Sequence, residues 1–131
     1  MESQGVLRPA RQVGDLCCSP VLQAELQPDE AQVLAGALKV LGDPARLRLL
    51  SLIRCAEGGR TTTAVLAGRL GLTQPTVTHH LGALFDAGFL GRERDGRQTW
   101  YWVNTDGVQA IRQLLDPTTS PLVPEAQARA M

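Results

Sequence analysis

The stretch LGLTQPTVTHHLGALFDAGFL, residues 70–90, decides the fold of this chain. Gly71 ends one short helical segment, and Thr73 is typical of the residue that caps the next helix. The apolar residues of that next helix recur at helical spacing, which predicts one buried face: Val77, Leu81, Leu84 and Phe85. Gly88 ends the helix. Two helices joined by a short glycine turn predict a helix-turn-helix.

A hairpin and a last helix follow. Residues 89–94 and 98–103 alternate like strands around Asp95-Gly96, and Asp-Gly is a strong hairpin signal. Apolar residues at helical spacing between 105 and 115 predict a final helix, which ends at Asp116-Pro117. A glycine-tipped hairpin directly after a helix-turn-helix is typical of a winged helix-turn-helix.

Two helices precede this motif. The first opens at Pro28 with acidic residues in its first turn, and Gly42 ends it. Asp43 is placed to cap the second helix, in which Leu47, Leu50 and Ile53 form the expected apolar stripe. Thr61-Thr62 is extended in character, and Thr63 is the expected cap of a helix over 64–70. The predicted order is α-α-α-α-β-β-α: mainly α with a small β-hairpin.

The 131 residues have the size of one domain. We expect residues 1–27 to form an irregular or extended arm, residues 28–116 the winged helix-turn-helix domain for DNA binding and dimerisation, and residues 117–131 a flexible tail. No apolar run reaches the roughly 18 residues that a membrane span needs, and the N-terminus lacks the apolar stretch of a secretory signal. We therefore expect a cytoplasmic protein that contacts no membrane.

The charge is unevenly distributed, although the net charge is zero. Residues 44–103 hold eight Arg against four acidic residues, a net of +4, so the flanks, with five basic and nine acidic residues, carry −4. A basic centre between acidic ends favours a nucleic-acid contact in the centre. An evenly solvated surface is the alternative interpretation.

The residues expected to contact DNA lie in two places. The second helix of a helix-turn-helix enters the major groove with its N-terminal residues, which here are Gln74, Thr76, Thr78 and His79. At about 100° per residue, His79 points away from the core whereas His80 falls at the edge of the buried face. Around the hairpin tip, the groups expected to reach phosphates or a minor groove are Arg92, Arg94, Arg97 and Gln98. Charges that protect a sheet edge are the alternative there, and we expect Trp100, Tyr101 and Trp102 to pack in the hairpin core.

Three segments resemble the ArsR/SmtB family of metalloregulatory repressors: LGDPARLRLL (residues 41–50), LGLTQPTVTHHLGAL (70–84) and DAGFL (86–90). The resemblance covers residues 30–115. It implies a homodimer paired through the first and last helices, which binds an imperfect inverted repeat in double-stranded operator DNA. It also implies that a metal or metalloid releases the operator.

The family uses several sensor sites, and two of them are missing from this sequence. The Cys-Val-Cys-Asp motif of many arsenic sensors would fall on residues 62–65, which read Thr-Thr-Ala-Val, and the zinc site of the last helix needs His where residues 104–116 have none. Some arsenic repressors of the family join two adjacent arm cysteines to a second-helix cysteine of the partner. Carried over, this implies a three-thiolate pocket of Cys17, Cys18 and Cys55.

Three soft thiolates without a fourth ligand favour As(III) or Sb(III) as inducer over Zn(II), which takes four ligands in structural sites. Cd(II) or Pb(II) is an alternative if water or a carboxylate completes the site. Three other functions stay open: a repressor that senses thiol oxidation or sulfur species, an enzyme with a Cys–His pair, and a DNA-binding module without any ligand. We expect no enzyme and no permanent cofactor.

Overall fold

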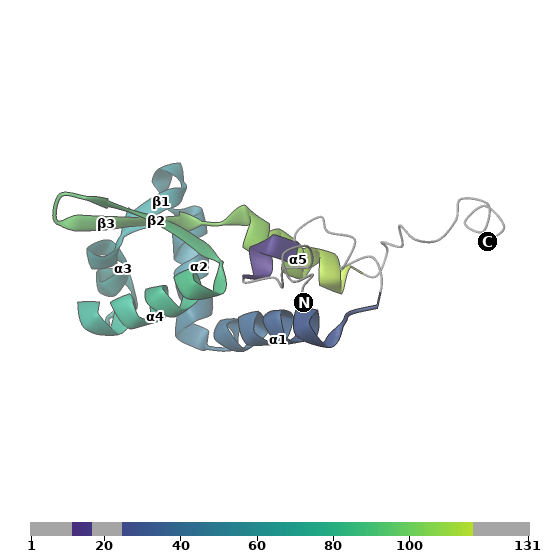
Figure 1. The fold of residues 1–131 in the computed structure, drawn as a ribbon. Coiled ribbons are helices and arrows are strands. Elements are labelled where there is room, and N and C mark those ends of the chain that lie inside the picture. Colours follow the sequence, from purple (N-terminus) through teal and green to yellow (C-terminus); the bar gives the residue numbers. More distant parts are fainter. Residues whose placement is uncertain (1–11, 17–24, 117–131) are drawn as a thin grey trace.

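The computed structural model describes residues 12–16 and 25–116. Helices dominate, and a small antiparallel sheet forms the wing, which confirms the predicted winged helix-turn-helix (Figure 1). The elements follow in this order: η1 (Val13–Leu16), α1 (Pro28–Leu41), α2 (Pro44–Cys55), η3 (Glu57–Gly59), β1 (Arg60–Thr62), α3 (Thr63–Leu70), α4 (Gln74–Ala87), β2 (Leu90–Asp95), β3 (Gln98–Val103) and α5 (Thr105–Leu115).

The N-cap of α2 is the residue that the sequence predicts, whereas the N-cap of α3 lies one residue earlier than predicted. Asp43 caps α2 as predicted, because its Oδ1 accepts hydrogen bonds from the backbone N–H of Ala45 at 2.8 Å and of Arg46 at 3.3 Å. The cap of α3 is Thr62, whose hydroxyl accepts from the N–H of Val65. The prediction of Thr63 was wrong by one residue, because Thr62 already has the extended backbone of a cap while Thr63 is helical.

The turn between α3 and α4 has the predicted glycine. Gly71 adopts φ 70°, a left-handed conformation that ends α3 without the cost that a side chain would add. Thr73 occupies the cap position of α4, but its side chain makes no capping bond. Its hydroxyl instead donates to the hydroxyl of Thr76 at 3.0 Å, so the predicted position of Thr73 as N-cap is confirmed but its side chain does not cap the helix.

The sheet has three strands in the order β1-β3-β2, all antiparallel. The hairpin β2–β3 was predicted, and the extended pair Thr61-Thr62 proves to belong to a third strand that pairs with Trp100–Trp102. This third strand, β1, pairs with the edge of β3 that faces away from β2, and it leads directly into α3.

The core lies between α2, α3, α4 and the inner face of the sheet, and its fully buried side chains include Leu49, Ile53, Leu66, Leu81, Leu84 and Phe89. The predicted face of α4 is confirmed. In α2 the prediction was wrong for Leu47, which is 52% exposed, while Leu49 is fully buried and Leu50 partly so. Leu occupies several faces of α2, so helical spacing alone fitted more than one inward direction.

Residues 13–16 of the N-terminal arm form a short 3-10 helix, which differs from the irregular or extended arm that we predicted, whereas residues 25–27 have no regular secondary structure. Val13 and Leu16 of η1 are in the core, where η1 packs mainly on α5. The Gln12 amide donates to the carbonyl oxygen of Asp86 at 3.0 Å, near the end of α4. Cys17 and Cys18 lie outside the described residues, as does the predicted tail over 117–131.

Helix α5 begins in close contact with the end of α4. Gly107 is buried, and a Cβ there would meet the carbonyl oxygen of Gly88 and lie 3.0 Å from its carbonyl carbon. Only a glycine fits this approach without displacing backbone. In Figure 1, α1, η1 and α5 lie at one end of the molecule and the hairpin tip lies at the other.

Candidate nucleic-acid interface

The first turns of α4 present a polar surface to solvent. The four predicted residues Gln74, Thr76, Thr78 and His79 are all exposed, whereas Val77 between them is fully buried. His80 is half-buried, as its place at the edge of the buried face predicted. The helix therefore carries hydrogen-bonding side chains along one exposed face over its first turns.

A cleft of about 250 Å³ separates this helix from the hairpin. Its lining residues come from α3, α4, the sheet and the hairpin turn: Thr62, Thr63, Ala64, Gln74, Thr78, Arg94, Arg97, Gln98, Thr99 and Tyr101. The structure thus brings Gln74 and Thr78 together with Arg94, Arg97 and Gln98. Two guanidinium groups beside hydroxyls and amides form a donor-rich surface, which suits the oxygens of a phosphodiester backbone.

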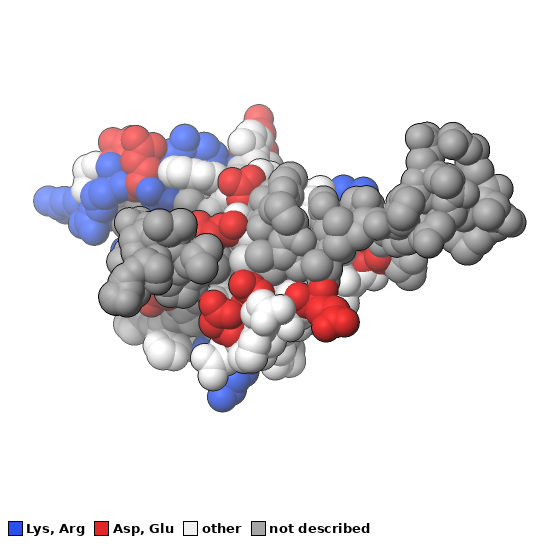
Figure 2. All heavy atoms as spheres, turned by 45° about the vertical axis from the view of Figure 1, so that its right-hand side comes forward, with Lys and Arg blue, Asp and Glu red and all other residues white. Residues whose placement is uncertain are grey.

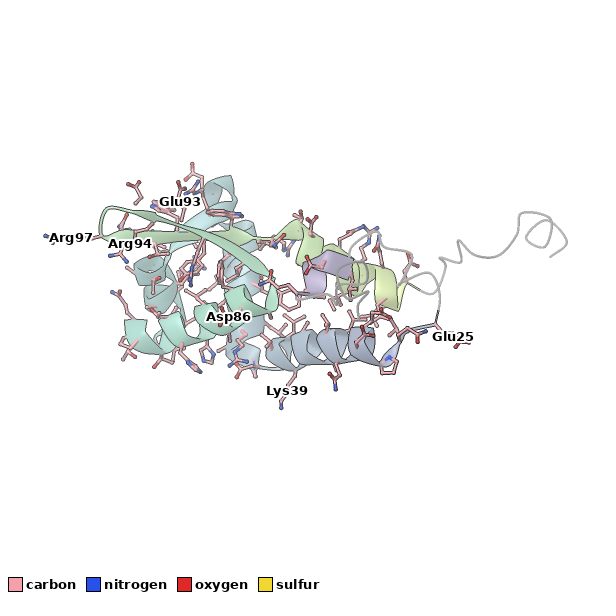
Figure 3. All side chains as sticks on the ribbon, viewed as in Figure 1. Glu25, Lys39, Asp86, Glu93, Arg94 and Arg97 are labelled. Atoms are coloured by element: carbon pink, nitrogen blue, oxygen red, sulfur yellow. The ribbon has the colours of Figure 1, made fainter. Side chains whose placement is uncertain are left out.

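The two arginines reach this cleft in different ways (Figure 3). Arg97 extends outward at the hairpin tip. Arg94 leaves β2 on the side of the helices, opposite to Glu93, and its Nε donates to the carbonyl oxygen of Gly96 at 3.0 Å. That bond holds the base of the guanidinium and leaves the Nη groups to serve a ligand.

Arg92 has a separate position. Its guanidinium carbon lies 3.9 Å above the ring centre of Phe85, near the end of α4. The register places Arg92 and Arg94 on the same face of β2, as alternation predicted, but the residues that line the cleft include only Arg94. A cation above an aromatic ring is attracted to the face of the ring, so Arg92 links the start of the hairpin to α4.

The outer face of the sheet is aromatic and charged. Tyr101 is buried as predicted, but Trp100 and Trp102 are only partly buried, with the Arg60 guanidinium 5.3 and 5.2 Å from their rings. The prediction that all three pack in the hairpin core was therefore wrong for the tryptophans, because alternation along β3 turns them to the opposite face from Tyr101. Arg60 also pairs with Glu93 at 3.1 Å.

The visible charge distribution agrees with the sequence. In Figure 2 most of the Lys and Arg side chains lie at the hairpin end of the molecule, with acidic side chains among them, whereas the charged side chains visible in the middle of this face are mainly acidic. The basic end is the one that carries the cleft, so the local charge there is favourable for an anionic polymer despite the zero net charge.

Sequence reasoning missed the contacts of Arg46. Its Nε donates to Nδ1 of His80 at 3.1 Å and its Nη1 donates to the carbonyl oxygen of Val40 at 3.3 Å. Burial raises the pKa of the neighbouring Asp43 carboxyl, but backbone N–H bonds from Arg46 and Ala45 and the positive charge of the Arg46 guanidinium outweigh it, so this pKa lies below its ordinary value. The sequence does carry a signal for this contact, the spacing Asp-Pro-x-Arg at residues 43–46, but we interpreted it only as the start of a helix.

The described residues contain one part of the predicted thiol site. Cys55, the last residue of α2, is exposed and carries a free thiol. Cys17 and Cys18 are outside the described ranges, and within those ranges no group of three or more His, Cys, Asp or Glu is arranged to hold a metal ion. Among the same residues, no helix has the length and apolarity to cross a lipid bilayer.

Comparison with known proteins identifies related regulators. A helix-turn-helix domain profile matches residues 41–91. An uncharacterised helix-turn-helix transcriptional regulator of Methanocaldococcus jannaschii is 35% identical over 82 residues, which are 63% of this chain and 90% of that protein. The arsenical resistance operon repressor of Staphylococcus xylosus is 34% identical over 83 residues, which are 63% and 77% of the two chains.

A further relative and one solved structure extend the comparison. The probable mercury resistance operon repressor of Streptomyces lividans is 35% identical over 91 residues, which are 70% of each chain. The solution structure of a homodimeric winged helix-turn-helix domain from Mycobacterium bovis has a TM-score of 0.57 at 20% identity and covers 82% of this chain and 87% of that one. With these relatives and this fold, the chain belongs to the ArsR/SmtB family of helix-turn-helix transcriptional regulators.

Proposed function

We propose that the protein is a homodimeric repressor that binds operator DNA, with α4 in the major groove and the hairpin in contact with the adjacent sugar-phosphate backbone. The cleft between α4 and the hairpin carries this proposal, because it gathers five of the eight residues predicted for DNA from three separate segments. A relative of the same fold is a homodimer, and a two-fold dimer reads an inverted repeat.

The DNA-binding half can be tested without knowing the operator. Duplexes that the wild-type protein enriches from a random-sequence pool should contain an imperfect inverted repeat. Thr78→Ala should weaken binding to the selected duplex by about 1–3 kcal/mol for each half-site if Thr78 contacts a base. Thr105→Ala is the matched control, because Thr105 is an exposed threonine at the start of α5. Failure to enrich any sequence would refute the proposal.

We also propose that trivalent arsenic or antimony releases the operator by binding the thiolates of Cys17, Cys18 and Cys55. Cys55 is accessible at the end of α2. Leu16, the residue before Cys17, is buried beside α5. Relatives named for arsenical and mercury resistance are consistent with a thiophilic inducer.

The sensor half needs a titration of the protein–duplex complex. Arsenite and antimonite should release the duplex, and single Cys→Ser variants at 17, 18 or 55 should bind it normally but fail to release it. Cadmium, lead, mercury(II), zinc and peroxide are the comparison arms. Release by peroxide alone would replace metalloid sensing with thiol oxidation, and full arsenite release of Cys55→Ser would remove Cys55 from the site.

A further inference from the structure

Arg46 lies where three helices meet. Its two hydrogen bonds join the last turn of α1, through the carbonyl oxygen of Val40, to the middle of α4, through His80, while Arg46 itself sits in the first turn of α2. The three elements are therefore tied by one side chain that is itself partly buried.

The chemistry of the Arg46–His80 bond fixes the state of the imidazole. Arginine stays protonated and has no acceptor, so Nδ1 of His80 must offer its lone pair. The ring in this contact is therefore neutral, with its proton on Nε2. A hydrogen bond from a charged donor is stronger than one between neutral groups. The planar guanidinium of Arg46 also gives the contact a defined direction.

This contact lies beside the exposed face of α4. The ring centres of His79 and His80 are 5.9 Å apart, and His79 is exposed while His80 turns toward α2. The same helix places Gln74 and Thr78 in the cleft. A rotation of α4 about its axis would change the direction of the exposed side chains and the Arg46–His80 distance together.

We propose that Arg46 is a positioning residue for DNA recognition: through His80 it fixes the rotation of α4 about its own axis, and through Val40 it sets that rotation relative to α1. This inference rests on the proposed DNA-binding function. The role of Arg46 requires no contact with a base or a phosphate, because Arg46 acts through α4.

The test compares variants of both partners on the duplex that the wild type selects. Arg46→Met keeps a long side chain without donors, and His80→Leu removes the acceptor, so each should weaken binding by about tenfold or more at pH 8. His80→Asn places an amide oxygen near the position of Nδ1 and should restore most of the affinity. Ile53→Val, which removes one buried methyl group from the core side of α2, is the control for lost stability alone and should bind like the wild type below its unfolding temperature.

Thermal melts of the same variants separate positioning from packing. The affinity for the duplex should follow the presence of an acceptor at position 80 and not the melting temperature, so His80→Asn should bind more tightly than His80→Leu even where the two are equally stable. Arg46→Met that is less stable yet binds normally, or His80→Asn that binds as weakly as His80→Leu, would overturn the inference. If the wild type binds no duplex at all, the proposed function has failed first.

Discussion

Replacing Arg97 by Ala gives a direct measure of what the hairpin contacts. Arg97 lies at the hairpin tip and lines the cleft without any contact that would hold it in the core. If it meets one phosphate in each half of a dimer, two phosphate contacts are lost. Each contact contributes about 0.9 to the slope of log affinity against log salt concentration, so the slope should become less steep by about 1.8.

This change in slope has a measurable size. Between 50 and 200 mM salt, a slope difference of about 1.8 corresponds to about a twelvefold change in the affinity ratio of wild type to Arg97→Ala. Fluorescence anisotropy with any labelled duplex long enough for the dimer suffices, because phosphate contacts carry no sequence information. Parallel lines for wild type and variant would refute the contact between Arg97 and phosphate.

A matched arginine guards against effects of total charge. Arg54 is an exposed arginine of α2 that does not line the cleft. Arg54→Ala removes the same charge from each subunit and should leave the slope unchanged. An equal change in both variants would mean that the whole protein field, and not a contact in the cleft, controls the salt dependence.

Two further predictions concern stability. Gly107→Ala should destabilise the protein by about 1–3 kcal/mol, because its Cβ would meet the Gly88 backbone, and each kcal/mol should lower the melting temperature by roughly 4–8 °C. Gly68→Ala in α3 should stabilise the protein, because a Cβ there has no atom within 4 Å. Thermal melts at equal concentration in which both variants shift in the same direction would contradict this prediction. Asp43→Asn keeps a capping oxygen but loses the charge, so the wild type should be the more stable protein at neutral pH. Because the pKa of Asp43 is lowered in the folded protein, denaturant titrations should show this difference in the free energy of unfolding disappear as the pH falls below about 4. A difference that persists at lower pH would count against a contribution of the charge.

Local signals in the sequence were enough for most of the fold. The caps at Asp43 and Gly71, the Asp95-Gly96 turn and the spacing of Val77, Leu81 and Leu84 each act within a few residues, so they could be recognised without knowledge of the rest of the chain. Leu47 shows the limit, because a helix with Leu on several faces does not reveal which face will meet the core.

The candidate site was predictable in its members but not in its geometry. Sequence patterns identified Arg92, Arg94 and Arg97 together, yet only two of them line the cleft and Arg92 lies on Phe85. Such a division depends on where α4 ends relative to β2, which is a long-range relation. The Arg46–His80 bond spans 34 positions and was missed for the same reason.

Both tryptophans of the chain lie on one strand, β3, and on one face of it. Because indole dominates ultraviolet emission, the intrinsic fluorescence of this protein comes from the wing and from almost nowhere else. The Arg60 guanidinium beside the two rings makes that emission sensitive to any rearrangement of the hairpin root. The fluorescence of the unlabelled protein therefore reports on the sheet of the wing and not on the helices.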